Sequence, residues 1–351
     1  MTPPPLLGLF HASACRFWAM ENRRARALAG EAALQGATVG LFGTTDVDFE
    51  SGTVRYMRMT PDGWTLWRGP MPDVVLIGRS VAGDADSPTV VRLRTLVPVA
   101  SWTLPDKAAV SEALQSTALA PYVIPFSRVA APDAEAVIAS FLDEHRRIVL
   151  KPADEHFGKR IFFVACDGDD IVMRQFEQRW RWPREIGFAE LASHVGGRLW
   201  IAQTMIVSRV RDGRAFDIFV HAHKDGNGRW TLVRSYARLS ESGVLATITG
   251  RGGYLGDLDS LLAALGDRGA ALAATVRRLG IRIGETLDPI YGGALDEIGV
   301  DIVVDPQHRP WIVEVNSGPV TRFHEFERAR PHVAHAMQLA RRFKAGVSEA
   351  P

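Results

Sequence analysis

Three polar side chains in the last sixth of the chain could together hold a hard metal ion. Asp301 lies in the apolar stretch Gly299–Val304, and Glu314 and Asn316 lie in the next apolar stretch. Because Asp305–Arg309 has the composition of a turn, the two stretches are predicted to pair as a hairpin. Alternation along a strand places Glu314 and Asn316 on one face, which Asp301 can share. Carboxylate and amide oxygens suit Mg²⁺ that also holds phosphate oxygens; the alternative is a polar, solvent-facing side of a hairpin.

Two lysines could bring positive charge to a phosphate. Lys107 follows Asp106 at the start of a predicted helix, and Lys151 ends the predicted strand Ile148–Lys151. A lysine in either place is normally a solvated surface charge. Beside a nucleotide, each would act as a point charge for phosphate oxygens, but neither lysine is specific alone.

The order and spacing of these motifs resemble those of the ATP-grasp superfamily, and most of all its endospore coat-associated, YheC/YheD-like branch. The resemblance covers about Leu6 to Phe343. It rests on Pro72-Asp73-Val74-Val75, Asp106-Lys107, Val149-Leu150-Lys151-Pro152, Gln203-Thr204-Met205-Ile206, Arg214-Ala215-Phe216-Asp217-Ile218, Tyr236-Ala237-Arg238, Arg251-Gly252-Gly253, Asp301 and Glu314-Val315-Asn316-Ser317-Gly318-Pro319.

The resemblance implies that the protein binds ATP and Mg²⁺. The nucleotide-binding residues it implies are Lys107, Lys151, Gln203, Thr204, Met205, Ile206, Asp217 and Arg160, with Gln203–Ile206 reading adenine. The implied metal ligands are Asp301, Glu314 and Asn316, and the implied catalytic cations are Arg238, Arg251 and Lys159. For Arg238 and Arg251, a role in surface solubility is the alternative.

Two positions depart from the family pattern. The lid loop Ala153–Arg160 contains a single glycine, so backbone amides alone cannot wrap a phosphate. We expect Lys159 and Arg160 to close over the phosphates with Asp154 and Glu155 turned to solvent; an exposed loop without a role is the alternative. The second departure is Phe219, which stands where the family often has an arginine, and Arg214 is a candidate replacement.

Length and composition exclude several classes of protein. The chain has 351 residues, a formal net charge of +1 and two cysteines. At about 150 residues per domain it should contain two or three domains. The near-zero charge argues against nucleic-acid or membrane partners. The few cysteines and the lack of a recognisable signal peptide or membrane span predict a cytoplasmic protein.

The predicted fold class is α/β. We expect an ATP-grasp fold with an N-terminal parallel-sheet domain over residues 1–100, a small lid domain over 101–205 and a C-terminal domain with the metal site over 206–345. ATP would lie between the last two domains.

The predicted activity is ATP-dependent ligation of a carboxylate to an amine or a thiol. It would proceed through an acylphosphate and convert ATP to ADP and phosphate. The expected substrates are small-molecule or peptide carboxylates and amines, and a homodimer is one expected assembly. An ATP-binding structural or regulatory protein without turnover is the alternative, and a small-molecule kinase is a weaker one.

Two further segments attract attention. His221 and His223 alternate on one strand face, but no Cys or His at zinc-site spacing accompanies them, so no zinc site is predicted. Arg174–Arg184 mixes arginine with aromatic residues, and a surface helix or lid segment is the favoured interpretation, with a substrate rim as the alternative.

Overall fold

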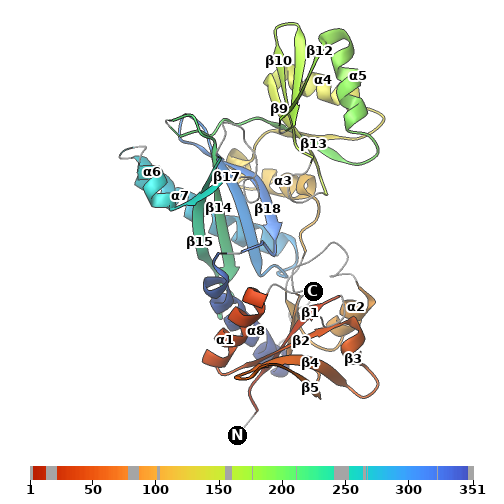
Figure 1. The fold of residues 1–351 in the computed structure, drawn as a ribbon, viewed down its shortest axis with the longest axis vertical. Coiled ribbons are helices and arrows are strands. Elements are labelled where there is room, and N and C mark those ends of the chain that lie inside the picture. Colours follow the sequence, from red (N-terminus) through yellow and green to blue (C-terminus); the bar gives the residue numbers. More distant parts are fainter. Residues whose placement is uncertain are drawn as a thin grey trace.

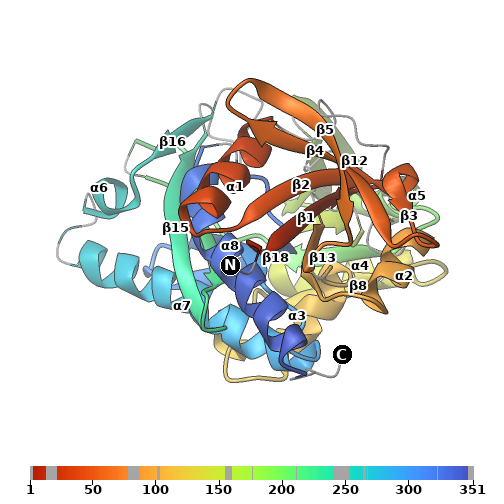
Figure 2. The same cartoon turned by 90° about the horizontal axis from the view of Figure 1, so that it is seen from below.

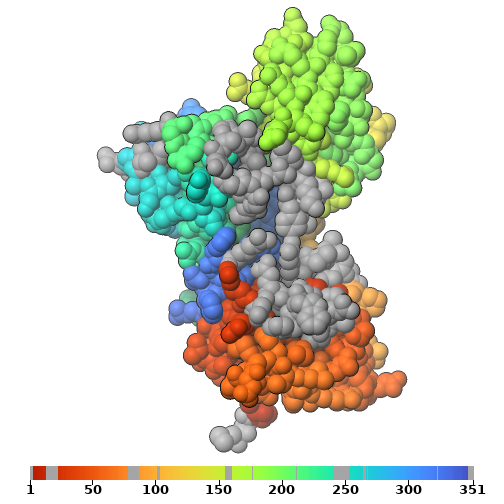
Figure 3. Space-filling view, viewed as in Figure 1, coloured from red at the N-terminus to blue at the C-terminus, as the bar shows by residue number. Residues whose placement is uncertain are grey.

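The described strands form three sheets that follow one another along the chain. The computed structural model describes residues 3–12, 22–77, 87–100, 103–154, 160–175, 177–210, 212–240, 253–263, 266, 268–321 and 323–346. The sheets contain seven, six and five strands. The first and second sheets lie at opposite ends of an elongated molecule, with the third between them (Figure 1). The part built on the second sheet, from β8 to β13, stands out as a separate lobe, which we name the lid lobe after the predicted lid domain (Figure 3).

The first sheet has a parallel centre, as expected for the predicted N-terminal parallel-sheet domain. Its order is β3-β4-β2-β1-β6-β7, with β5 paired to β4. Its elements are β1 (Leu6–His11), α1 (Asn22–Leu34), β2 (Thr38–Gly43), η1 (Thr44–Asp46), β3 (Val47–Asp48), β4 (Thr53–Thr60), β5 (Gly63–Pro70), β6 (Val74–Ile77), α2 (Pro88–Arg94) and β7 (Val99–Ala100). The C-terminal helix α8 (Glu325–Lys344) returns to pack beside α1 on this sheet (Figure 2).

The second sheet is antiparallel, in the order β12-β11-β10-β9-β13-β8. Its elements are β8 (Phe126–Val129), α4 (Ala134–His145), β9 (Arg147–Pro152), β10 (Phe162–Asp167), β11 (Asp170–Gln175), β12 (Gln178–Pro183), α5 (Arg184–His194) and β13 (Trp200–Thr204). The helix expected within Arg174–Arg184 is therefore wrong, although the segment does belong to the lid lobe. Trp180 and Trp182 alternate with arginines, and both pack against the apolar cluster of this lobe.

The third sheet carries most of the candidate site. Its order is β16-β15-β14-β17-β18, and its elements are β14 (Phe216–Lys224), β15 (Trp230–Leu239), β16 (Tyr254–Gly256), α6 (Leu258–Ala263), α7 (Arg268–Ile290), β17 (Glu297–Val304) and β18 (Pro310–Ser317). The helix α3 (Lys107–Gln115) and the 3₁₀ turn η2 (Ala120–Tyr122) pack at its β18 side. Ile218, Val220 and Ala222 face the core with α7. Alternation therefore turns Asp217, Phe219, His221 and His223 to the opposite face. Among the described residues, no helix has the length and apolar character to cross a bilayer.

The contact between α7 and β14 depends on a small residue. A Cβ added at Gly280 would lie 2.3 Å from Cγ1 of Val220. We therefore expect Gly280→Ala to lower the free energy of unfolding by about 1–3 kcal/mol through overpacking. Gly30→Ala in α1 is the matched control, because nothing lies within 4 Å of its added Cβ. Removal of a helical glycine should there raise stability by up to about 1 kcal/mol. Urea denaturation measures both; equal effects of the same sign would contradict the packing account.

Candidate nucleotide and metal site

The predicted β17–β18 hairpin is confirmed, and its register brings the proposed metal ligands together. Asp301 pairs with Glu314, and Asn316 pairs with Gly299. A bulge follows Asp301 in this ladder. Burial is the largest cause of the raised pKa of Asp301, which is about 6. The negative charges of Asp217 and Glu314 also raise this pKa, and Arg238 opposes the shift. A carboxylate whose pKa is raised by neighbouring carboxylates is suited to a divalent cation.

Arg238 links two carboxylates of this face. Its guanidinium donates to both oxygens of Asp217, at 2.6 and 2.9 Å, and to Oδ1 of Asp301 at 2.6 Å. The β14–β15 register places Asp217 directly opposite Arg238. Burial lowers the pKa of Arg238, but Asp301 and Asp217 outweigh that effect and hold the pKa well above its usual value. Asp217 is thus engaged with Arg238, which it orients.

Lys151 connects the second sheet to the third. Its side chain is buried, and its Nζ donates to Oε1 of Gln203 at 3.0 Å and to the carbonyl oxygen of Val313 at 3.1 Å. Burial lowers the pKa of Lys151 to about 8, and Lys107 adds to the shift. The Val313 carbonyl gave no signal in the sequence, because any residue supplies a carbonyl.

Lys107 completes the group at the start of α3. Asp106 caps this helix by accepting hydrogen bonds from the amides of Ala108 and Ala109. Lys107 is therefore fixed at the first helical position, and its Nζ lies 3.6 Å from Oε2 of Glu314. The structure thus brings Lys107, Lys151, Gln203, Asp217, Arg238, Asp301, Glu314 and Asn316 into one region where the lid lobe meets the third sheet.

The remaining predicted residues are placed less closely. Thr204 ends β13, and its amide donates to the Pro125 carbonyl, while the amide of Met205 donates to that of Arg147. These two backbone amides are therefore already engaged. Arg160 is exposed, and Asp154 is exposed near Arg198, at 3.8 Å. Arg251, Lys159 and Glu155 lie outside the described residues.

The position of Phe219 explains the second departure from the family pattern. Phe219 is buried, its ring packs 5.1 Å from that of Tyr236, and the Arg238 guanidinium lies 5.5 Å from its ring centroid. An apolar wall therefore stands beside Arg238. Arg214, the candidate replacement, pairs with Asp212 at 2.6 Å in an exposed turn.

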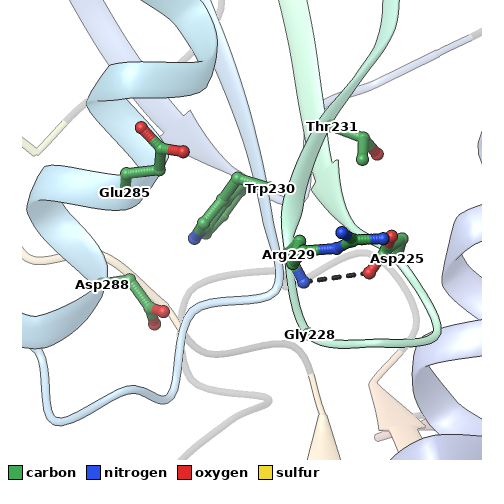
Figure 4. A pocket seen from close by; sticks show the side chains of 7 residues that line it. All are labelled: Asp225, Gly228, Arg229, Trp230, Thr231, Glu285 and Asp288. Carbon is green, nitrogen blue, oxygen red and sulfur yellow. Dashed lines mark hydrogen bonds and ion pairs between the residues drawn. The ribbon is translucent and has the colours of Figure 1, made fainter.

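A separate pocket of about 530 Å³ lies at the far end of β14 (Figure 4). The Trp230 ring faces Glu285 and Asp288 of α7. On the other side of the pocket, Arg229 turns back to Asp225. Asp217 and Lys224 stand at opposite ends of β14, about 23 Å apart for a strand of this length. This pocket is therefore distinct from the region around Asp301.

Comparison with known proteins assigns the chain to a family. Residues 96–342 match the family model described as YheC/D-like ATP-grasp, so the chain belongs to that family and has the ATP-grasp fold. It is 22% identical over 318 residues to the endospore coat-associated protein YheD of Bacillus subtilis (strain 168), covering 86% of this chain and 68% of that protein.

Two solved structures show the same fold. The D-alanine-D-alanine ligase from Coxiella burnetii is similar with a TM-score of 0.61 and 11% identity, covering 98% of this chain and 96% of that one. The ATP-grasp ligase PsnB, solved with a phosphomimetic variant of its minimal precursor, Mg and ADP, has a TM-score of 0.52 and 10% identity, covering 96% and 97% of the two chains.

Because burial lowers the pKa of Lys151 to about 8, the affinity for ATP should depend on pH. Lys151→Ala should weaken ATP binding by about 1.5–3 kcal/mol, the value of a charged hydrogen bond. In the wild type, a pKa of about 8 means that the ammonium is lost as pH rises, so affinity should fall between about pH 7 and about pH 9. Lys151→Arg stays charged but places a planar fork in a point-charge site, so it should bind weakly and without this decline. Calorimetric titration with Mg·ATP measures all three; identical pH profiles for the wild type and Lys151→Arg would contradict the placement.

Proposed function

We propose that this protein is an ATP-dependent ligase that joins a carboxylate to an amine. The proposal is supported chiefly by the arrangement around Arg238, in which one buried guanidinium, two lysines and three oxygen ligands converge between the lid lobe and the third sheet. A thiol acceptor is the variant of the same chemistry.

The residues present fit a magnesium ion with ATP. Asp301, Glu314 and Asn316 offer two carboxylates and an amide oxygen from one hairpin. In the structure, Arg238 and Lys107 stand next to these carboxylates and compensate their charge. When bound, Mg²⁺ would supply charge neutralisation for the phosphate oxygens.

The positively charged side chains of the protein would bind the phosphates and stabilise the charge that develops during transfer. Lys107 and Lys151 would hold the phosphates, and Gln203 would fix Lys151 through its side-chain oxygen. Arg238, oriented by Asp217, would face the charge that develops as the γ-phosphoryl group moves to a substrate carboxylate oxygen. The bond from that phosphorus to the ADP oxygen would break, and an amine would then displace phosphate from the acylphosphate. Phe219 would keep water from this intermediate.

A hydroxylamine trap tests the proposal. The protein would be incubated with Mg·ATP, hydroxylamine and single amino acids or short peptides, because hydroxylamine converts any acylphosphate to a coloured iron–hydroxamate. We expect ADP and hydroxamate in equal amounts with at least one carboxylate class. Binding of ATP without ADP formation would instead indicate a binding protein, and a stable phosphorylated product would indicate a kinase.

A further inference from the structure

A second cluster of buried polar side chains lies on the same sheet face, away from the nucleotide site. His221 and His223 of β14 and Glu297 of β17 belong to it, and His223 pairs directly with Glu297 in the sheet. Helix α8 packs over this part of β14 and brings His332. All four side chains are 2% exposed or less.

Three nitrogen atoms in this cluster have no hydrogen-bond partner among the described residues. They are Nε2 of His223 and both ring nitrogens of His332. The other nitrogen of His223, Nδ1, lies 2.7 Å from the carbonyl oxygen of Lys224. Because a carbonyl can only accept, Nδ1 carries the proton and Nε2 presents a bare lone pair. An outer hydrogen bond of this kind typically fixes a metal-binding histidine.

The cost of leaving these atoms unpaired is substantial. Each buried polar group without a partner costs about 1–3 kcal/mol. Such groups in a native protein call for an explanation, of which an ion or a water is the simplest. The lone pair on His223 needs a proton donor or a metal, and no donor among the described residues forms a hydrogen bond with it.

The third member, Glu297, still has room for a ligand. His221 and the Nε of Arg328 donate to its Oε1, and Nη2 of Arg328 donates to Oε2 at 2.7 Å. A carboxylate has about four acceptor sites, so one remains on Oε2. His221 and Arg328 thereby hold the carboxylate in place.

The spacing of the three ligand atoms is close to that of a metal site. One atom each from His223, Glu297 and His332 lies within 4.8 Å of the others. Zinc bonds of about 2.0 Å in a tetrahedron separate ligand atoms by about 3.3 Å, so shifts of about 1 Å would close the site. Buried carboxylates around it are Glu297, Glu325 and Asp296, and buried cations are Arg24, Arg328 and Lys224, the last of which pairs with Asp288 at 2.7 Å. A bound cation would therefore have negative as well as positive charges around it.

We propose that His223, Glu297 and His332 bind a structural zinc ion that fastens α8 to the third sheet. Two imidazoles and a carboxylate suit zinc rather than magnesium, which prefers oxygen ligands. A water would take the fourth position. Since α8 also packs on the first sheet, the ion would hold the N-terminal and C-terminal parts together. This proposal does not depend on ligase activity.

Metal analysis of the full chain tests the proposal. Protein stripped with a chelator would be titrated with Zn²⁺ in the presence of excess Mg²⁺, desalted and measured by plasma emission, with thermal unfolding followed in parallel. We expect about one zinc per chain and a rise in Tm on loading. Cobalt(II) in place of zinc should give visible absorption typical of a tetrahedral site.

Single variants locate the ion. His332→Gln and His223→Gln should each raise the Kd for zinc more than about 100-fold. The control His194→Gln, in α5 of the lid lobe, should leave it unchanged. Stripped wild type that binds no zinc and gives no cobalt band would overturn the proposal and leave a buried water only. Unaltered zinc affinity in folded variants would also overturn it, and the wild-type titration decides even if a variant does not fold.

Discussion

The double variant Glu314→Ala/Asn316→Ala is expected to lose ATP turnover by more than about 100-fold while keeping its fold. Both side chains lie in β18 on the face shared with Asp301, so together they supply an oxygen ligand pair. Glu314 also raises the pKa of Asp301, so its removal lowers that pKa, and Lys107 loses its contact with Glu314 at 3.6 Å. ADP release in steady state measures turnover, and circular dichroism reports the fold.

A control variant distinguishes the loss of any carboxylate from the loss of a carboxylate at this site. Glu144→Ala removes a carboxylate that is 73% exposed in the lid lobe, and it should leave turnover and stability unaltered. A double variant that turned over ATP at the wild-type rate would remove the metal assignment from β18.

Arg238→Gln is expected to have the second largest effect, and it should act on both stability and activity. Its guanidinium is nearly buried between Asp217 and Asp301, so its loss leaves two carboxylates without their partner. Breaking a buried ion pair from one side costs about 3–5 kcal/mol. We expect urea denaturation to show a loss near the lower end of that range, because the side chains retain some contact with solvent.

The activity of Arg238→Gln should fall in kcat more than in ATP affinity, by about 100- to 1,000-fold, since charge on the γ-phosphate grows during transfer. Arg234→Gln is the control, because Arg234 lies on the same strand, β15, but pairs with the exposed Glu327. Equal losses in kcat for the two variants would assign Arg238 a structural role only.

Much of the site could be predicted because its residues belong to patterns that are local in the sequence. The hairpin that joins Asp301 to Glu314 follows from two apolar strands and a polar turn of five residues, Asp305–Arg309. Lys107 follows from the capping Asp106, whose preference for a helix start is local chemistry. Parallel pairing of β1 with β2 follows from the helix between them.

What could not be predicted depends on residues far apart in sequence. No local feature of the sequence indicates that α8 would place His332 beside His223, which precedes it by 109 residues. The period-two alternation of Trp180 and Trp182 is typical of a strand such as β12, but the arginines beside them obscure the pattern. The engagement of Arg214 by Asp212 depends on the turn geometry rather than on composition.

Transfer of labelled oxygen tests the central claim most directly. On a carboxylate that the hydroxylamine trap identifies, both carboxylate oxygens would be labelled with ¹⁸O and the released phosphate examined by mass spectrometry. Attack by that carboxylate on the γ-phosphorus predicts one ¹⁸O in each phosphate released during ligation. Unlabelled phosphate accompanying product formation would contradict the acylphosphate route at this site.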